Sequence, residues 1–134
     1  SNNAGLVQVF VFEDRVLRWI QLGQNLLGDA FPGALFGWSV SLSGDGHTVL
    51  CGAPHHGGSS SNGDRSGMAR AYRYDPPRHE WIQLGQDLYG TNIEDEAGYF
   101  VALSDDGTRA VVTAPDHDAN GSSNTGHMRV YELL

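Results

Sequence analysis

The sequence WIQLGQNL at residues 19–26 returns almost unchanged as WIQLGQDL at residues 81–88. Two further motifs recur with similar spacing, namely GWSVSLSGDG at 37–46 with GYFVALSDDG at 98–107, and GLVQVF at 5–10 with GMARAY at 67–72 and GHMRVY at 126–131. Self-similarity at a nearly fixed spacing is the mark of a repeat architecture. The chain therefore holds about two copies of one unit of roughly sixty residues.

Each repeated segment is a short β-strand by its pattern. Apolar residues alternate or run together over five to eight positions, and Gly, Pro, Asn or Asp bound each run, which is typical of strands and not of helices. Residues 43–46 (SGDG) and 104–107 (SDDG) are short enough for tight hairpin turns, with Gly where a positive φ is needed. One unit then has antiparallel strands at 36–42, 48–53, 68–74 and 80–86.

The phase of the repeat divides the chain unequally. Residues 31–92 hold one complete four-stranded unit, whereas residues 1–30 hold only the third and fourth strands of an earlier one. Residues 93–134 hold the first three strands of a later unit, at 99–103, 108–114 and 127–133. We therefore expect an all-β chain whose C-terminal sheet lacks its fourth strand.

The composition agrees with a turn-rich β-domain and excludes several function classes. The chain has 134 residues, 40% of them apolar, and 18 glycines, which is enough to bury a core and to supply many tight turns. A formal charge of −8 argues against nucleic acid and anionic membrane surfaces as partners. No apolar run approaches the roughly 20 residues that span a bilayer, so we expect no membrane insertion. The single cysteine, Cys51, lies in an apolar strand and is interpreted as a small buried hydrophobe.

Two motifs give the repeat a family resemblance. Phe36-Gly37 is followed after one hairpin by Gly52-Ala53-Pro54, and the second copy reads Ala97-Gly98 and then Thr113-Ala114-Pro115. This pattern resembles the FG-GAP repeat that builds the β-propeller of integrin α chains. The resemblance implies tandem propeller-blade-like sheets, an extracellular or cell-surface location, and adhesion or ligand binding. The family often carries a calcium loop between FG and GAP, and here only the bare turns at 43–46 and 104–107 stand there.

About two blades cannot close a propeller, which takes roughly four to eight. The apolar faces and edge strands of such sheets must be covered by flanking repeats of the same chain or by copies of it. In one interpretation the sequence is a window of a longer array. In the other it is the whole protomer, and its N-terminal hairpin, residues 6–25, donates a fourth strand to the next copy and builds a head-to-tail filament.

One loop has the pattern of a cation site. Asp116, Asp118 and Asn120 stand at alternate positions before Gly121, as at the start of a calcium loop, although no later Glu completes it. An ordinary Asx-rich loop is the alternative interpretation. Asn120-Gly121-Ser122 is also an acceptor for N-glycosylation, which would make the chain a glycoprotein if it is secreted.

Other polar and aromatic residues have simpler interpretations. His55, His56 and His117 follow Ala-Pro and are interpreted as solvated loop histidines, with a transition-metal site as the alternative. The acidic run 94–96 is interpreted as a solvated face. Trp19 and Trp81 recur at one strand position and are expected to pack between sheets.

No catalytic constellation stands out, because we find no nucleophile with a base, no paired carboxylates on a strand end and no phosphate-binding loop. The sequence therefore predicts a non-enzymatic, extracellular structural or adhesive protein that self-associates through open sheet edges. A fragment of a larger propeller that binds a protein or glycan ligand, with calcium assisting, is the alternative. A propeller enzyme is a third class.

Overall fold

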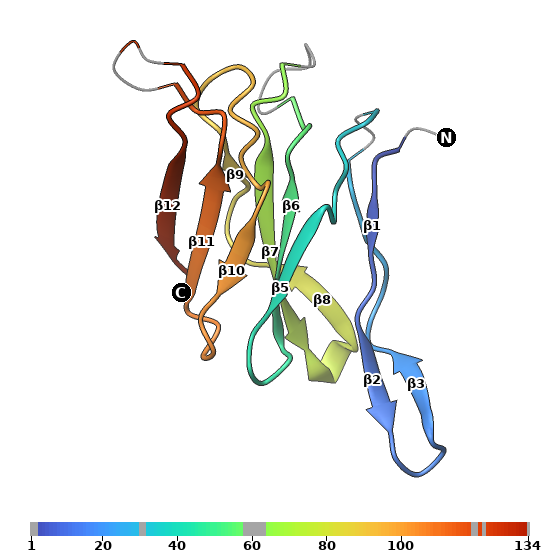
Figure 1. The fold of residues 1–134 in the computed structure, drawn as a ribbon. Helices are drawn as coiled ribbons and strands as arrows, with labels where there is room; N and C mark the ends of the chain where they lie inside the picture. Colours follow the sequence, from blue (N-terminus) through green and yellow to red (C-terminus); the bar gives the residue numbers. More distant parts are fainter. Residues whose placement is uncertain (1–2, 30–31, 58–63, 119–120, 122, 134) are drawn as a thin grey trace.

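The computed structural model describes residues 3–29, 32–57, 64–118, 121 and 123–133. The fold is all-β, as predicted, with twelve short strands and a single 3₁₀ turn at Pro76–Arg78 in the described part. Every pair of strands is antiparallel, and the strands form several separate small sheets, none of which closes on itself (Figure 1). No helix in these ranges is long and apolar enough to cross a membrane.

The middle sheet contains the complete repeat unit. Its strands lie in the order β5 (Ser39–Leu42), β6 (Thr48–Ala53), β7 (Met68–Asp75) and β8 (Glu80–Gln83), and β9 (Leu88–Tyr89) pairs with the other end of β7. The predicted continuous fourth strand, residues 80–86, is therefore wrong. Gly85 has a φ of 74°, which turns the chain out of the strand between β8 and β9.

The first strand is also shorter than predicted, because Phe36 forms an isolated parallel bridge with Gly5 and regular pairing begins only at Ser39. This bridge joins the first residue of the predicted first strand to the segment that leads into β1. Gly67 and Ala97 form the same bridge one repeat later. Each unit is thus tied to its neighbour at the point where the chain enters it.

The flanking sheets are incomplete. At the C-terminal end, β10 (Val101–Leu103), β11 (Arg109–Ala114) and β12 (His127–Glu132) form a three-stranded sheet, and no described strand pairs with the outer edge of β12. At the N-terminal end, β1 (Leu6–Val7) pairs with β4 (Leu26–Leu27), and β2 (Phe10–Glu13) pairs with β3 (Arg18–Gln21). By repeat position, β1 and β2 correspond to β7, and β3 and β4 correspond to β8 and β9.

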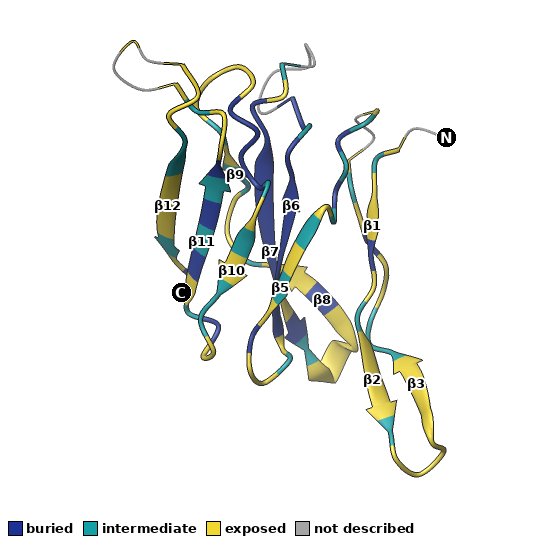
Figure 2. Ribbon diagram, viewed as in Figure 1, coloured by how far each residue is buried: buried dark blue, intermediate teal, exposed yellow. Residues whose placement is uncertain are grey.

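Two apolar layers hold the N-terminal strands, the middle sheet and the C-terminal sheet together. One layer packs the N-terminal strands on the middle sheet and includes Val7, Leu26, Phe36 and Trp81, and the other packs the middle sheet on the C-terminal one. All six residues of β6 are buried, and burial raises the pKa of the Cys51 thiol to about 12. Figure 2 shows β6 and β7 buried at the centre and β2, β3 and much of β12 exposed. The middle sheet is therefore covered on both faces and the outer sheets on one.

The two predicted hairpin turns are confirmed. Asp45 Oδ1 accepts hydrogen bonds from the Ser43 hydroxyl and the His47 N–H, at 2.7 and 2.9 Å. Asp106 accepts the matching bonds from Ser104 and Thr108, which lower its pKa to about 2. Both aspartates stabilise turns through local hydrogen bonds, as their sequence positions predict.

Candidate functional site

The predicted calcium loop lies at one end of the sheets, beside a polar hollow of about 220 Å³. Asp116 and Asp118 line this hollow together with Arg65, Glu94, Glu96 and Asn124. Asp118 Oδ1 accepts the N–H of Asn124 at 2.7 Å, which is the bond expected of an Asx-rich loop. Asn120 lies outside the described residues, and within them no three His, Cys, Asp or Glu side chains are placed to hold a metal. Calcium binding and glycosylation at Asn120 stay predictions.

The acidic run at 94–96 is not a solvated face, because only Glu94 is exposed while Asp95 is 1% exposed and Glu96 8%. Asp95 Oδ2 accepts the backbone N–H groups of Thr91 and Asn92 and lies 3.0 Å from His117 Nδ1. Burial would raise the pKa of Asp95, but the hydrogen bonds from His117 and the backbone outweigh it and lower that pKa. The connector between the middle and C-terminal sheets folds inward here and brings Asp95 close to these hydrogen-bond donors.

His56 and His117 occupy matching positions, and each faces a carboxylate on the connector that leads into its own sheet. His56 Nε2 lies 3.3 Å from Asp29 Oδ2, and His117 makes the contact with Asp95. The interpretation of His56 as a solvated histidine is wrong, since it is 5% exposed. The His127 ring lies 4.1 Å from that of His117, and burial lowers the pKa of His127, as does its electrostatic interaction with His117. His56 and His117 thus each link a connector to the sheet into which that connector leads.

Arg70 on β7 forms an ion-pair link that the sequence analysis missed. Its guanidinium donates to both carboxylate oxygens of Asp87, each at 2.6 Å, and to Asp29 at 3.0 and 3.1 Å. These bonds raise the pKa of Arg70 against the opposing effect of burial. Asp29 lies on the connector between the N-terminal and middle sheets, so Arg70 holds two units together. A signal was present, because Arg70 is a charged residue inside the otherwise apolar run at residues 68–72.

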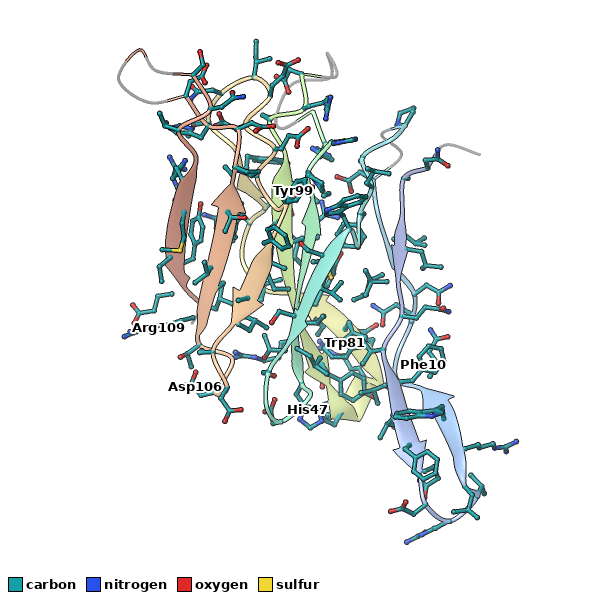
Figure 3. The ribbon with its side chains drawn as sticks, viewed as in Figure 1. Phe10, His47, Trp81, Tyr99, Asp106 and Arg109 are labelled. Atoms are coloured by element: carbon teal, nitrogen blue, oxygen red, sulfur yellow. The ribbon has the colours of Figure 1, made fainter. Side chains whose placement is uncertain are left out.

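The recurring WIQLGQ motif forms the joint between two sheets. The Trp81 indole is 3% exposed, and its Nε1 donates to the Leu22 carbonyl at 2.7 Å. Gln24 Oε1 accepts the Trp81 N–H at 2.8 Å, and Gln24 Nε2 donates to the Trp81 carbonyl at 2.7 Å. Only glycine fits at position 23, because a Cβ there would stand 2.6 Å from Trp81 Cδ1. The Trp of one motif thus binds the Leu-Gly-Gln of the preceding one. Trp81 is labelled in Figure 3.

The same motif is uncovered at the N-terminal end of the chain. Trp19 on β3 is 67% exposed and touches Phe12 edge to face, with ring centroids 5.4 Å apart. The expectation that Trp19 packs between sheets is wrong for the isolated chain, because no described sheet lies on its outer side. The β2–β3 hairpin extends beyond the middle sheet (Figure 1) and exposes a run of large apolar residues: Phe10, Val11, Phe12, Val16, Leu17, Trp19 and Ile20.

The C-terminal end is uncovered as well. Met128 and Val130 on β12 are 62% and 61% exposed, whereas Ala69 and Ala71 at the same positions of β7 are buried. Beside β12, a second hollow of about 220 Å³ is lined by Leu84, Gly85, Gln86, Leu88 and residues 131–133. The two ends of the chain therefore expose surfaces that its interior joints bury.

Small antiparallel sheets that pack face to face, with Trp81 buried in one of the joints, are typical of a β-propeller-type repeat domain. The FG-GAP repeat matches residues 19–72, so the chain contains an FG-GAP repeat and the predicted resemblance is confirmed. The match runs from the N-terminal WIQLGQ motif into β7, where it ends at Tyr72. No curated protein matches the chain.

Proposed function

We propose that this chain is an extracellular, non-enzymatic structural or adhesive protein that associates with copies of itself head to tail. One observation carries the proposal: the two ends expose complementary halves of the joint that is buried in the middle of the chain. The C-terminal end exposes the β12 edge and the hollow beside Gly85, and the N-terminal end exposes the Trp19 motif. The FG-GAP repeat supports the extracellular setting.

Physical chemistry favours association at these ends. An open edge strand presents unpaired N–H and C=O groups that template pairing with another strand. The β2–β3 hairpin gathers several large exposed apolar side chains, and such exposed apolar surface marks interaction sites. Because the two ends differ, the contact between copies is heterologous, and such contacts build open filaments unless their rotation closes a ring.

A binding role in a larger propeller is the alternative, and the polar hollow beside Asp116 favours it. Four carboxylates line that hollow, from Glu94, Glu96, Asp116 and Asp118, and oxygen ligands suit calcium, although among the described residues no three of them stand close enough together to hold an ion in this structure. In this case the loop end would bind a protein or glycan ligand with calcium assisting. Calorimetric titration with calcium tests it: heat that Asp118→Ala removes supports the alternative, and no heat with the unaltered chain removes it.

Sedimentation of the purified chain over a range of concentrations tests the proposed function. We expect species that grow with concentration beyond the dimer. A chain that stays monomeric at every concentration contradicts self-association.

A further inference from the structure

We propose that the hollow beside Gly85 is a socket for the indole of Trp19 from a second copy of this chain. The inference rests on the proposed self-association and names the contact that produces it. It starts from the filled socket within the chain, where Leu22, Gly23 and Gln24 hold the indole and backbone of Trp81.

The residues of the open socket repeat those of the filled one. Leu84, Gly85 and Gln86 stand one repeat after Leu22, Gly23 and Gln24. A Cβ built on Gly23 meets Trp81, whereas one on Gly85 meets nothing within 4 Å. The Gln86 side chain makes no hydrogen bond to any described residue. Its amide is therefore available to bond to the backbone of an inserted strand, as Gln24 bonds to the backbone of Trp81.

The far wall of the open socket also corresponds to the filled one. Tyr74 of β7 packs on Trp81, with ring centroids 5.3 Å apart. Leu133, which follows β12, stands at the position of Tyr74 in the repeat and lines the hollow. An indole placed there would lie between Leu133 and Gly85, as Trp81 lies between Tyr74 and Gly23.

Trp19 has the properties that this socket requires. It opens the same WIQLGQ motif as Trp81 and is 67% exposed. The other exposed tryptophan, Trp38, lies outside the motif and packs against Tyr99, with ring centroids 5.8 Å apart. Trp19 therefore matches the socket both in local sequence and in accessibility.

The strand that carries Trp19 matches the open edge of β12. Trp81 lies on β8, which pairs with β7 in the register Tyr74↔Trp81. The same register places β3 of a second copy beside β12, with Trp19 opposite Leu133. In the β7–β8 ladder, Arg73 and Glu80 stand diagonally opposite each other on one face. In the pairing between copies, Glu132 takes the position of Arg73 and Arg18 that of Glu80, so the acidic and the basic residue exchange strands. Opposite charges at such positions stabilise strand pairing.

In this arrangement β12 takes the place of β1 and β2 beside β4 and β3, because β1 and β2 together are the third strand of their unit, as β12 is of its own. The β2–β3 ladder has four residue pairs and the β1–β4 ladder has two, each in a two-stranded sheet, which is marginally stable by itself. The β11–β12 ladder has six pairs, and Leu133 is buried at its end. The exposed Met128 and Val130 then cover the second copy's middle sheet where Val7 and Val9 lie in the free chain.

Two variants disable opposite halves of the contact. Trp19→Ala removes the indole and keeps the socket. Gly85→Ala keeps the indole and places a Cβ where the filled socket leaves 2.6 Å to Trp81 Cδ1. The matched control is Gly46→Ala, since Gly46 has nearly the same φ, 73° against 74°, and also meets nothing within 4 Å but lies in the β5–β6 turn.

Sedimentation of each variant alone and of their equimolar mixture tests the proposal. We expect the unaltered chain and Gly46→Ala to assemble, and Trp19→Ala and Gly85→Ala to sediment as monomers. The mixture should form dimers of twice the chain mass and nothing larger, because the Gly85→Ala copy supplies an indole to the intact socket of the Trp19→Ala copy. This complementation also shows that both variants are folded.

Three outcomes overturn the proposal, and they separate it from the proposed function. If the unaltered chain assembles and either single variant still assembles as well, self-association stands and the socket is wrong. A mixture that stays monomeric while the unaltered chain assembles likewise contradicts the Trp19 contact. If the unaltered chain never assembles, the proposed function fails and the inference with it.

Discussion

Trp81 Nε1 donates a 2.7 Å hydrogen bond to the carbonyl of Leu22, a residue of the preceding repeat. The bond joins two copies of one sequence motif, so the motif supplies both the side chain that inserts and the backbone that receives it. A chain built of such motifs has a receiving surface at one end and an inserting residue at the other. This asymmetry is the physical basis of the proposed self-association.

The Trp81 joint should be a main source of stability. Trp81→Ala removes a buried indole and its hydrogen bond, and we expect a loss of about 3 to 5 kcal/mol in the free energy of unfolding. Trp19→Ala is the matched control, because the same residue type is exposed and should change the stability of the unassembled chain by about 0.5 kcal/mol or less. Urea unfolding of dilute samples measures both, and equal losses would contradict the assigned roles.

Arg70 should be essential for the link between sheets, in contrast to Arg129 at the same repeat position. Arg70→Ala leaves Asp87 without its buried partner, which costs about 3 to 5 kcal/mol when a buried pair is broken. Arg129 is exposed on β12, so Arg129→Ala should cost about 0.5 kcal/mol or less. Thermal unfolding of the two variants compares them directly, and a mild effect at Arg70 would show that this ion pair adds little.

The buried Asp95 should make the chain sensitive to acid. Its pKa in the folded chain lies below the ordinary value of 3.8, so the unfolded chain binds a proton first as the pH falls. The stability that Asp95 contributes is therefore present above that ordinary value and is lost as the pH falls through the lower, folded one. We expect Asp95→Asn to be less stable at neutral pH and to lose less stability between pH 5 and 2. A slope equal to that of the unaltered chain would argue against the hydrogen bonds assigned to Asp95.

Burial of Trp19 on association should be visible in fluorescence. In a Trp38→Phe background the remaining indoles are Trp81, which is already buried, and Trp19, which is exposed. Raising the protein concentration should shift the emission maximum to shorter wavelength as Trp19 leaves water. Adding Gly85→Ala to this background should abolish the shift, and a shift that persists would place Trp19 in another contact.

Much of the fold was predictable because its signals are local. Alternating apolar residues and the Asp-Gly turns at Asp45 and Asp106 specify strands and hairpins within a few residues. The break between β8 and β9 was missed, although Gly85 marks it. Burial was harder to predict, because it depends on neighbours distant in sequence. Trp19 and Trp81 have the same local sequence, yet only Trp81 has a sheet to cover it.

The polar contacts between sheets depend on distant neighbours in the same way. Asp95 resembles a solvated residue in a run of three acids, and only the inward fold of its connector brings it to His117. Arg70 forms ion pairs with Asp29 and Asp87, which lie on two different segments of the chain. Such contacts are set by tertiary packing, which a pattern of residue types does not specify.

Electron microscopy of the purified chain tests the central claim, head-to-tail association, most directly. The account predicts unbranched filaments, because each copy receives a neighbour at β12 and offers its own β3 to another. Particles of single-chain size, or closed dimers in which both copies use the same surface, would contradict it.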